Sequence, residues 1–306
     1  MKERIETVAI VGMGALGMLY GGITREKLGT DSVCFVLDEE RKARYGEEPC
    51  VINGAETDFR LCTPEEVQPA DLVIVATKGT DLQSALPAVK AATGPDTTVI
   101  SVLNGITSEQ IIAEAVPEKQ IVDCVALGMD AVREGRTLTY NSAGKLQIPR
   151  KDKKKQEAID RLVRFFEETG IVYELMDDIQ HAMWNKFMLN VGINQVSAVY
   201  GVTYRESVQP GEAMADMVAA MREVIDISAE EWIFLSEDDL ETNIRIIREL
   251  GTDGIPSMRQ DILAKRKTEV ELFAGTVIEK ARKYDIPVPV NKRLYKLIRE
   301  MEESYL

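Results

Sequence analysis

Polar side chains interrupt an apolar stretch in the second half of the chain at regular intervals. Lys186, Asn190 and Asn194 are spaced four residues apart, and Ser197 follows them. With the 3.6-residue period of a helix, these positions share one face. A lysine among apolar neighbours is costly unless it faces a cleft or a partner. The pattern predicts a binding face on which a cation stabilises negative charge, but a lysine that reaches the solvent beside structural amides explains it too.

A second candidate group lies further along the chain. Glu269 shares one predicted helical face with Met258, Ile262, Phe273 and Thr276, so a carboxylate interrupts a face that should be buried. A bound polar group explains this placement, and so does an i,i+4 ion pair with Lys265. Ser257 opens the same predicted helix and forms an S-x-x-Q capping-box pattern with Gln260. Two roles are therefore possible for Ser257, a contact with a ligand and a structural cap of the helix.

A glycine-rich turn near the N-terminus has the G-x-G-x-x-G pattern. It follows the β-branched run at residues 7–12 and precedes a helical stretch, and its members are Gly12, Met13, Gly14, Ala15, Leu16 and Gly17. The first glycine permits a tight turn, the second permits close approach of a diphosphate, and the third permits close packing of the helix. Free N–H groups at the helix start favour an anion. The turn therefore predicts a dinucleotide site, with a turn that binds no ligand as the alternative.

The residues after the second predicted strand bear on the choice of dinucleotide. Asp38 stands about 20 positions after the glycines, where an acidic residue suits a ribose 2′-hydroxyl, as in NAD. Arg41, Lys42 and Arg44 follow, and basic residues there suit the 2′-phosphate of NADP. The residues indicate both cofactors.

Strands and helices alternate in the first half of the chain, which predicts an α/β fold with a doubly wound parallel sheet. After residues 7–12, further strands are expected at Val33–Leu37, Leu72–Ala76, Val99–Leu103, Ile121–Leu127 and Ile171–Leu175. Helices are expected at Gly17–Leu28, at Asp81–Ala92 and in the stretch that Gly170 closes. An antiparallel hairpin is expected from Thr137–Tyr140 and Lys145–Ile148 around an N-S-A-G turn.

The second half of the chain is helical in pattern. Helices are expected at Ile179–Tyr200, Ala213–Trp232, Glu237–Leu250, Ser257–Tyr284 and Asn291–Tyr305. The sequence therefore predicts an N-terminal Rossmann-type parallel-sheet domain over residues 1–177 and an all-helical C-terminal domain over residues 178–306. The helical domain offers surface for a homodimer.

The composition limits the classes of partner and compartment. The chain has 306 residues and a formal net charge of −14. Nucleic acids and anionic membranes attract basic surfaces, so neither is expected as a partner. The four cysteines are scattered, which predicts free thiols and no metal site. A cytoplasmic protein is expected, because no apolar run approaches the length of about 20 residues that spans a membrane and the N-terminus lacks a signal-peptide pattern.

Several motifs in order make the chain resemble the ketopantoate reductase (2-dehydropantoate 2-reductase) family over essentially its whole length. They are G-M-G-A-L-G, A-T-K, L-N-G-I, W-N-K-F-M-L-N-V-G-I-N and S-M-R-Q-D-I-L-A-K-R-K-T-E. The resemblance implies that Lys186 is the catalytic lysine. It implies substrate contacts by Asn190, Asn194, Ser257 and Glu269, and it places Lys78 and Asn104 beside the cofactor and substrate.

The resemblance implies a reductase that converts ketopantoate to pantoate, for pantothenate and coenzyme A synthesis, with NADPH. NADPH is narrowly favoured, and NADH stays open because Asp38 stands where NADPH-dependent members have arginine. Gln195 also departs from the family, in which proline often follows the second asparagine. A reductase of another small 2-oxo acid and a non-catalytic nicotinamide-binding sensor are the alternatives. No family role falls on His181, the only histidine.

Overall fold

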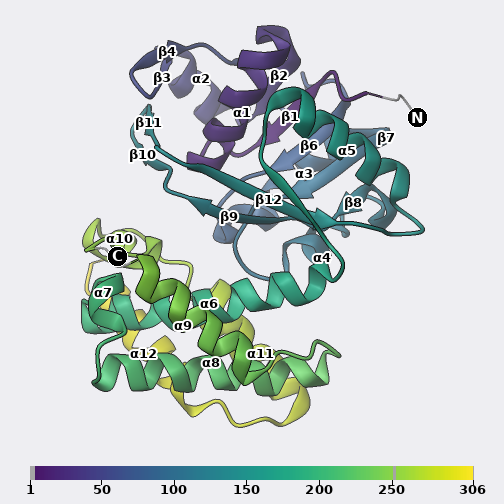
Figure 1. Cartoon of the computed structure of the whole chain (residues 1–306). Coiled ribbons are helices and arrows are strands. Elements are labelled where there is room, and N and C mark those ends of the chain that lie inside the picture. Colours follow the sequence, from purple (N-terminus) through teal and green to yellow (C-terminus); the bar gives the residue numbers. More distant parts are fainter. Residues whose placement is uncertain (1–3, 251–252, 306) are drawn as a thin grey trace. The chain divides into compact units, whose positions relative to one another are not determined.

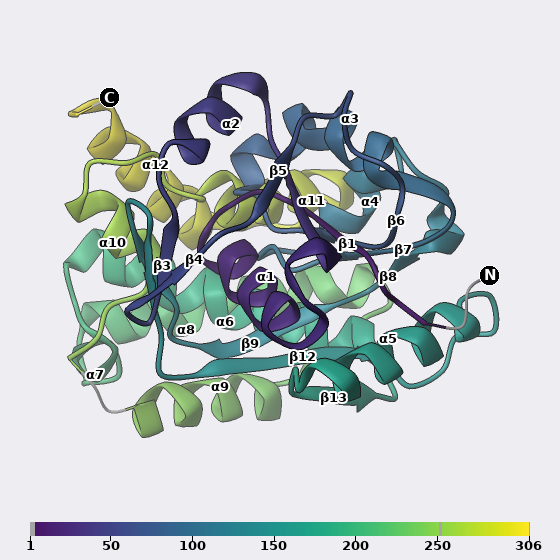
Figure 2. The same ribbon diagram turned by 90° about the horizontal axis from the view of Figure 1, so that it is seen from above.

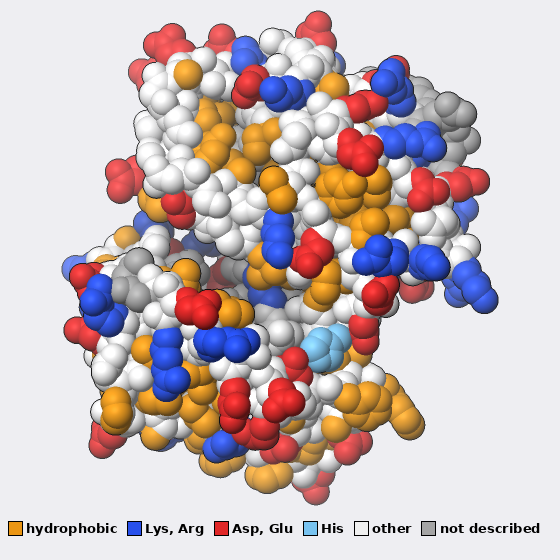
Figure 3. Space-filling model, viewed as in Figure 1, with side chains coloured by type: hydrophobic (Ala, Val, Ile, Leu, Met, Phe, Trp, Pro, Cys, Tyr) orange, Lys and Arg blue, Asp and Glu red, His pale blue; other side chains and the backbone are white. Residues whose placement is uncertain are grey.

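The computed structural model describes residues 4–250 and 253–305 (Figure 1). The chain divides into two compact units, unit 1 (Met1–Ile179) and unit 2 (Gln180–Leu306). The expected domain boundary, after residue 177, falls two residues before this division. None of the helices in the described part of the chain has the length and apolar character that a membrane span requires. On the face seen in Figure 3, acidic and basic side chains are interspersed.

Unit 1 is built on a six-stranded parallel sheet with the order β5-β2-β1-β6-β7-β8. Its strands are β1 (Val8–Val11), β2 (Val33–Val36), β5 (Arg60–Cys62), β6 (Ala70–Val75), β7 (Thr93–Ser101) and β8 (Ile121–Val122). This is the strand order of a dinucleotide-binding Rossmann sheet. The predicted fold class of unit 1 is therefore confirmed.

Helices cover both faces of this sheet (Figure 2). One face packs on α1 (Ala15–Leu28) and α5 (Gln156–Thr169), and the other on α3 (Leu82–Ala92) and α4 (Ser108–Ile112). Alternate residues of β1 serve the two faces, because successive side chains of a strand point to opposite sides. Val8 and Ile10 join the α1–α5 core, whereas Ala9 and Val11 join the α3–α4 core.

Shorter helices complete unit 1. They are α2 (Glu39–Gly46) and the 3₁₀ turns η1 (Thr30–Ser32), η2 (Gly79–Asp81) and η3 (Glu118–Gln120). Gly170 adopts φ 75° and closes α5, as the sequence predicts.

Two small sheets flank the main one, and they correct two predictions. The first has the order β10 (Val132–Glu134), β11 (Thr137–Thr139), β3 (Cys50–Ile52) and β4 (Ala55–Thr57). The second has the order β13 (Tyr173–Met176), β12 (Ala143–Pro149) and β9 (Val125–Met129). The predicted single strand Ile121–Leu127 is wrong, because β8 and β9 lie in different sheets. Both β8 and β9 contain buried apolar residues, so the apolar run in the sequence gives no sign that the strand ends between them.

The predicted hairpin of Thr137–Tyr140 and Lys145–Ile148 is also wrong, because β11 and β12 lie in different sheets. The Asp130 carboxylate accepts hydrogen bonds from the backbone N–H groups of Asn141 and Ser142 at 2.8 and 2.7 Å. These bonds hold the turn against the end of β9, and the one from Ser142 does most to keep the pKa of Asp130 below its ordinary value.

Unit 2 is helical, as predicted. Its elements are α6 (Ile179–Tyr200), α7 (Tyr204–Ser207), α8 (Glu212–Glu230), α9 (Glu237–Leu250), α10 (Ser257–Leu263), the π-helical turn η4 (Glu271–Gly275), α11 (Thr276–Tyr284) and α12 (Pro289–Glu303). Gly192 lets α6 pack closely on α8, because a Cβ there would lie 2.8 Å from Cγ of Met221.

The predicted continuous helix Ser257–Tyr284 is wrong, because the chain leaves it after α10. Lys265 has φ 51°, and the side chain of Arg266 donates to the Asp261 carboxylate at 2.7 Å. Beyond this turn, the backbone N–H and the hydroxyl of Thr268 each donate to Oε1 of the buried Glu302 at 2.7 Å. These contacts fix the segment outside a helix.

We expect Glu302→Ala to lower the free energy of unfolding by about 2–3 kcal/mol, because it leaves the buried N–H of Thr268 without an acceptor. Urea denaturation measures the change, and the exposed neighbour Glu303→Ala is the control. Equal losses for the two variants would contradict the role given to Glu302.

Candidate active site

The glycine-rich turn between β1 and α1 is shaped by close backbone approach. Gly12 has φ 104°, and a Cβ there would lie 2.7 Å from the carbonyl carbon of Ala76. A Cβ at Gly17 would collide with the carbonyl oxygen of Gly12. At Gly14, by contrast, a Cβ would lie in ordinary van der Waals contact with the Ala76 oxygen at 3.6 Å, so the fold itself does not require glycine there. Among the described residues, no side chain caps the start of α1 at Ala15.

This geometry fits the diphosphate of a dinucleotide. The first N–H groups of a helix lack partners within the helix and carry the positive end of its dipole. The absence of a side chain at Gly14 lets phosphate oxygens reach N–H groups at the start of α1. The close backbone approaches at Gly12 and Gly17 and the uncapped helix start are the features that such a site needs.

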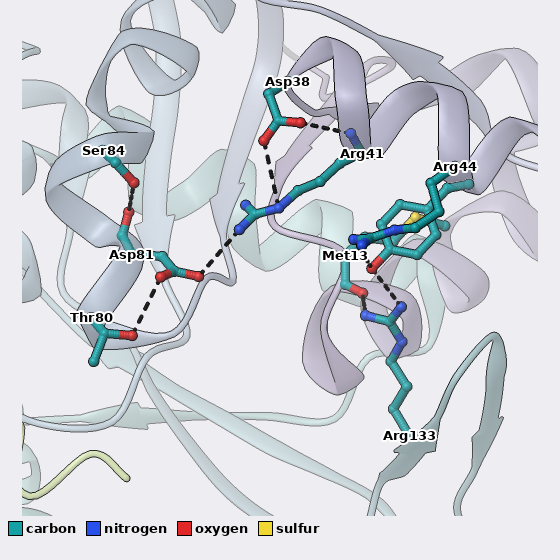
Figure 4. Close-up of polar contacts among 9 residues, drawn as sticks. Met13, Asp38, Arg41, Arg44, Thr80, Asp81, Ser84 and Arg133 are labelled. Atoms are coloured by element: carbon teal, nitrogen blue, oxygen red, sulfur yellow. Dashed lines mark hydrogen bonds and ion pairs between the residues drawn. The ribbon is translucent and has the colours of Figure 1, made fainter. Parts of the chain in front are cut away.

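The end of β2 carries an ion-pair row (Figure 4). Oδ1 of Asp38 accepts a hydrogen bond from the backbone N–H of Arg41 at 2.7 Å, so Asp38 caps α2. The Arg41 guanidinium lies 3.5 Å from Oδ2 of Asp38 and 3.6 Å from Oδ2 of Asp81, which ends η2. One positive and two negative charges leave this row with a net charge of −1.

The other basic residues after β2 have separate partners. Nζ of Lys42 lies 2.5 Å from both carboxylate oxygens of Glu66, and this contact raises the pKa of Lys42 and lowers that of Glu66. The Arg44 guanidinium lies over the ring of Tyr45, 5.0 Å from its centroid. Of the predicted basic cluster, Arg44 alone is not bound to a carboxylate of the described residues.

Arg133 of β10 is a candidate that sequence reasoning missed. It donates to the carbonyl oxygen of Met13 inside the glycine-rich turn (Figure 4). It also donates to the Tyr45 hydroxyl and to the Gly135 carbonyl oxygen, each at 2.8 Å. Burial raises the pKa of Tyr45, but Arg133 and Arg44 together outweigh it, and the pKa lies below its ordinary value. Arg133 and Met13 are 120 positions apart, and no local pattern signals the contact.

The remaining predicted residues of unit 1 also follow strands of the main sheet. Lys78 comes after β6 as the residue that precedes η2, and its side chain is exposed. Asn104 is half-buried in the loop after β7. Gly12 and Asp38 follow β1 and β2. The structure thus brings all the predicted residues of unit 1 to the carboxyl edge of the sheet, where open α/β sheets bind dinucleotides.

In unit 2, α6 and the start of α10 are joined through the side chain of Asn194. Its Nδ2 lies 3.4 Å from Oδ1 of Asn190, and its Oδ1 accepts from the Ser257 hydroxyl and the Met258 backbone N–H, each at 3.3 Å. Asn194 is buried and Ser257 is exposed. Lys186 is half-buried earlier on the same face of α6. The structure brings Asn190, Asn194 and Ser257 together.

The predicted capping box is wrong. Pro256 is the N-cap residue of α10, which makes Ser257 the first residue of the helix. The side chain of Gln260 donates instead to the Ile255 carbonyl oxygen at 3.1 Å. The contact of Ser257 with Asn194 therefore leaves the ligand interpretation in place.

Two polar residues of α6 have structural contacts. The Ser197 hydroxyl is buried and donates to the Val202 carbonyl oxygen. Nε2 of His181 lies 3.4 Å from Oδ2 of Asp239 at the start of α9. Because its hydroxyl is used within the protein, Ser197 adds no free polar group to the face of α6 that carries Lys186.

Glu269 lies in the non-helical segment between α10 and η4. It is half-buried, and its carbonyl oxygen accepts from the N–H groups of Leu272 and Phe273 at 2.9 and 3.3 Å. Because the segment is not helical, the predicted face shared with Met258 and the i,i+4 pairing with Lys265 are both wrong. The expected role of Glu269 now depends on the family resemblance.

Known proteins match both units. A 2-dehydropantoate 2-reductase from Halobacterium salinarum is 28% identical over 95% of this chain and 97% of its own. The solved D-mandelate dehydrogenase in complex with NADH covers 98% of this chain and 100% of its own, with a TM-score of 0.88 and 24% identity. The solved structure of a PanE/ApbA family ketopantoate reductase from Ralstonia eutropha JMP134 covers 98% of this chain and 99% of its own, with a TM-score of 0.83 and 24% identity.

Two family models match the chain itself. The model described as ketopantoate reductase PanE/ApbA matches residues 8–153. The model described as ketopantoate reductase PanE/ApbA C terminal matches residues 178–302. Since the two models together span most of the sequence, the chain belongs to the ketopantoate reductase family.

Proposed function

We propose that this chain reduces the ketone of ketopantoate to give pantoate, with a nicotinamide dinucleotide as the source of hydride. The observation that carries the proposal is the hydrogen-bonded group of Asn190, Asn194 and Ser257, on the face of α6 that also presents Lys186. The Halobacterium salinarum relative, named 2-dehydropantoate 2-reductase, supports ketopantoate as the substrate.

The proposed substrate residues suit the groups of ketopantoate. Hydride addition to a ketone leaves negative charge on its oxygen, and the Lys186 ammonium stabilises that charge and supplies a proton. The amides of Asn190 and Asn194 orient the molecule without adding charge. The Ser257 hydroxyl, which has one donor hydrogen, turns from Oδ1 of Asn194 to donate to the substrate carboxylate when the substrate binds. The Glu269 carboxylate accepts from the substrate hydroxyl.

The residues of unit 1 have proposed roles at the cofactor. The glycine-rich turn and the start of α1 hold the diphosphate, and Lys78 and Asn104 line the cofactor and substrate at the carboxyl edge. A reduced nicotinamide supplies the hydride when bound.

We propose NADH as the preferred cofactor, although the family resemblance favours NADPH. Arg41 lies between the carboxylates of Asp38 and Asp81, and Lys42 is bound to Glu66, so neither offers an unshared charge to a 2′-phosphate. Two like charges 4 Å apart, such as a carboxylate and a 2′-phosphate, repel by about 1 kcal/mol in water and about 4 kcal/mol at an effective dielectric of 20. Asp38 and Asp81 are 57% and 44% exposed, so the lower value applies.

Turnover with a panel of 2-oxo acids tests the proposed substrate. The panel contains ketopantoate, an analogue that lacks its 4-hydroxyl, and phenyl-substituted and branched 2-oxo acids, each with NADH and NADPH. We expect the highest kcat/KM for ketopantoate. A higher value for another 2-oxo acid would identify a reductase of that acid, and cofactor binding without any turnover would identify a sensor.

Replacement of the proposed catalytic lysine tests its role. We expect Lys186→Ala to lower kcat by about 100-fold or more, because it removes stabilisation that develops only in the transition state. The Kd for NADH, measured by fluorescence, should stay within about two-fold of the parent value. Lys292→Ala, at an exposed position of α12, is the control. Parent-like turnover in Lys186→Ala would show that another group supplies the proton.

The ion-pair row provides a test of cofactor choice. We expect Asp38→Ala and Asp81→Asn each to lower the ratio of kcat/KM for NADH over NADPH by about five- to ten-fold, since each removes about 1 kcal/mol of repulsion toward a 2′-phosphate. Asp31→Asn, an exposed acid in η1, should leave the ratio unchanged. A parent enzyme that prefers NADPH would overturn the assignment of NADH.

A further inference from the structure

The guanidinium of Arg133 is fixed by three hydrogen bonds and still has unused N–H donors. A guanidinium has five N–H donors in a planar fork. Nε of Arg133 donates to the Gly135 carbonyl oxygen, Nη1 to the Met13 carbonyl oxygen and Nη2 to the Tyr45 hydroxyl. Each terminal nitrogen therefore keeps one further N–H.

The charge of this group is not balanced within the protein. Arg44 and Arg133 both lie over the Tyr45 ring, at 5.0 and 5.1 Å from its centroid. Neither guanidinium pairs with a carboxylate in residues 4–250 and 253–305. Nearby basic residues do: Arg41 pairs with Asp38 and Asp81, Lys42 with Glu66, and Arg136 with Glu48. Two guanidiniums that share one phenol and have no carboxylate partner among the described residues make a positive site that attracts an anion, in a chain of net charge −14.

The anchor of Arg133 indicates which anion. Met13 directly precedes Gly14, the N-cap residue of α1, so the guanidinium is bound to the residue next to the helix start whose N–H groups favour a phosphate. A planar fork also matches phosphate oxygens in pairs.

We propose that Arg133 is a further cofactor-binding residue that contacts the diphosphate. Tyr45 is a positioning residue, since its hydroxyl accepts from Nη2 of the guanidinium and its ring lies against it. The assignment rests on the proposed function, in that the cofactor is a nicotinamide dinucleotide. A 2′-phosphate is a different target for the same charge, and the anchor on the glycine-rich turn favours the diphosphate, because Asp38 marks the ribose end of the site.

Calorimetric binding of cofactor fragments tests the proposal without turnover. The ligands are NADH, ADP, AMP and adenosine 2′,5′-bisphosphate, and the proteins are the parent, Arg133→Ala, Arg133→Lys and Lys145→Ala. Lys145 pairs with Glu174 on the surface of unit 1 and controls for loss of one positive charge. We expect Arg133→Ala to weaken NADH and ADP roughly ten- to thirty-fold, as loss of a charge-assisted hydrogen bond does. Arg133→Lys should recover part of this loss, and Lys145→Ala should bind as the parent.

Two results would overturn the role of Arg133 while the proposed function stands. One is parent-like ADP affinity in both Arg133 variants. The other is a loss confined to adenosine 2′,5′-bisphosphate, which would move the contact to a 2′-phosphate. If the parent itself binds neither NADH nor ADP, the nicotinamide dinucleotide fails as the cofactor, and the proposed function fails with it. Thermal melting of each variant confirms that the protein compared is folded.

Discussion

The close approach of the glycine-rich turn to the end of β6 is the constraint on which unit 1 depends. Gly12 passes so near the Ala76 carbonyl that a Cβ would not fit, and Gly17 allows α1 to begin directly against the turn. As a result, the start of α1 reaches the same edge of the sheet as the ends of β2 and β6. At that edge Asp38 and Asp81 both form ion pairs with Arg41, and Arg133 of β10 donates a hydrogen bond to the turn.

In unit 2 the side-chain amide of Asn194 connects two helices. The side chain of Asn194 is hydrogen-bonded toward Asn190 on one side and toward Ser257 and Met258 on the other. Its neighbour Gln195, where the family often has proline, donates to the Val191 carbonyl and to Asn291 in α12 at 2.8 and 2.9 Å. These bonds hold this part of α6 to α10 and α12. Rigid helices with fixed amides keep a site pre-organised for its ligand.

The sequence predicted those parts of the molecule whose signals are local. The bounds of α6 and α9 agree with prediction, because long helical patterns show their own ends. The glycine-rich turn was predicted for the same reason. The helix predicted over Ser257–Tyr284 breaks because Thr268 binds Glu302, 34 positions away, and no local pattern records such a contact. The sequence does not predict the contact of Arg133 with Met13 or the pairing of Asp81 with Arg41 for the same reason. In both cases the partners are distant in the sequence and come together only in the folded chain.

Transfer of isotope from cofactor to product tests the central claim most directly. Ketopantoate would be incubated with the enzyme and NADH that carries deuterium at the transferred position of C4, and the product would be examined by mass spectrometry and NMR. We expect pantoate with a single deuterium on C2, formed in step with NADH oxidation. Pantoate without deuterium, or NADH that binds to the protein and is never oxidised in the presence of ketopantoate, would contradict this expectation.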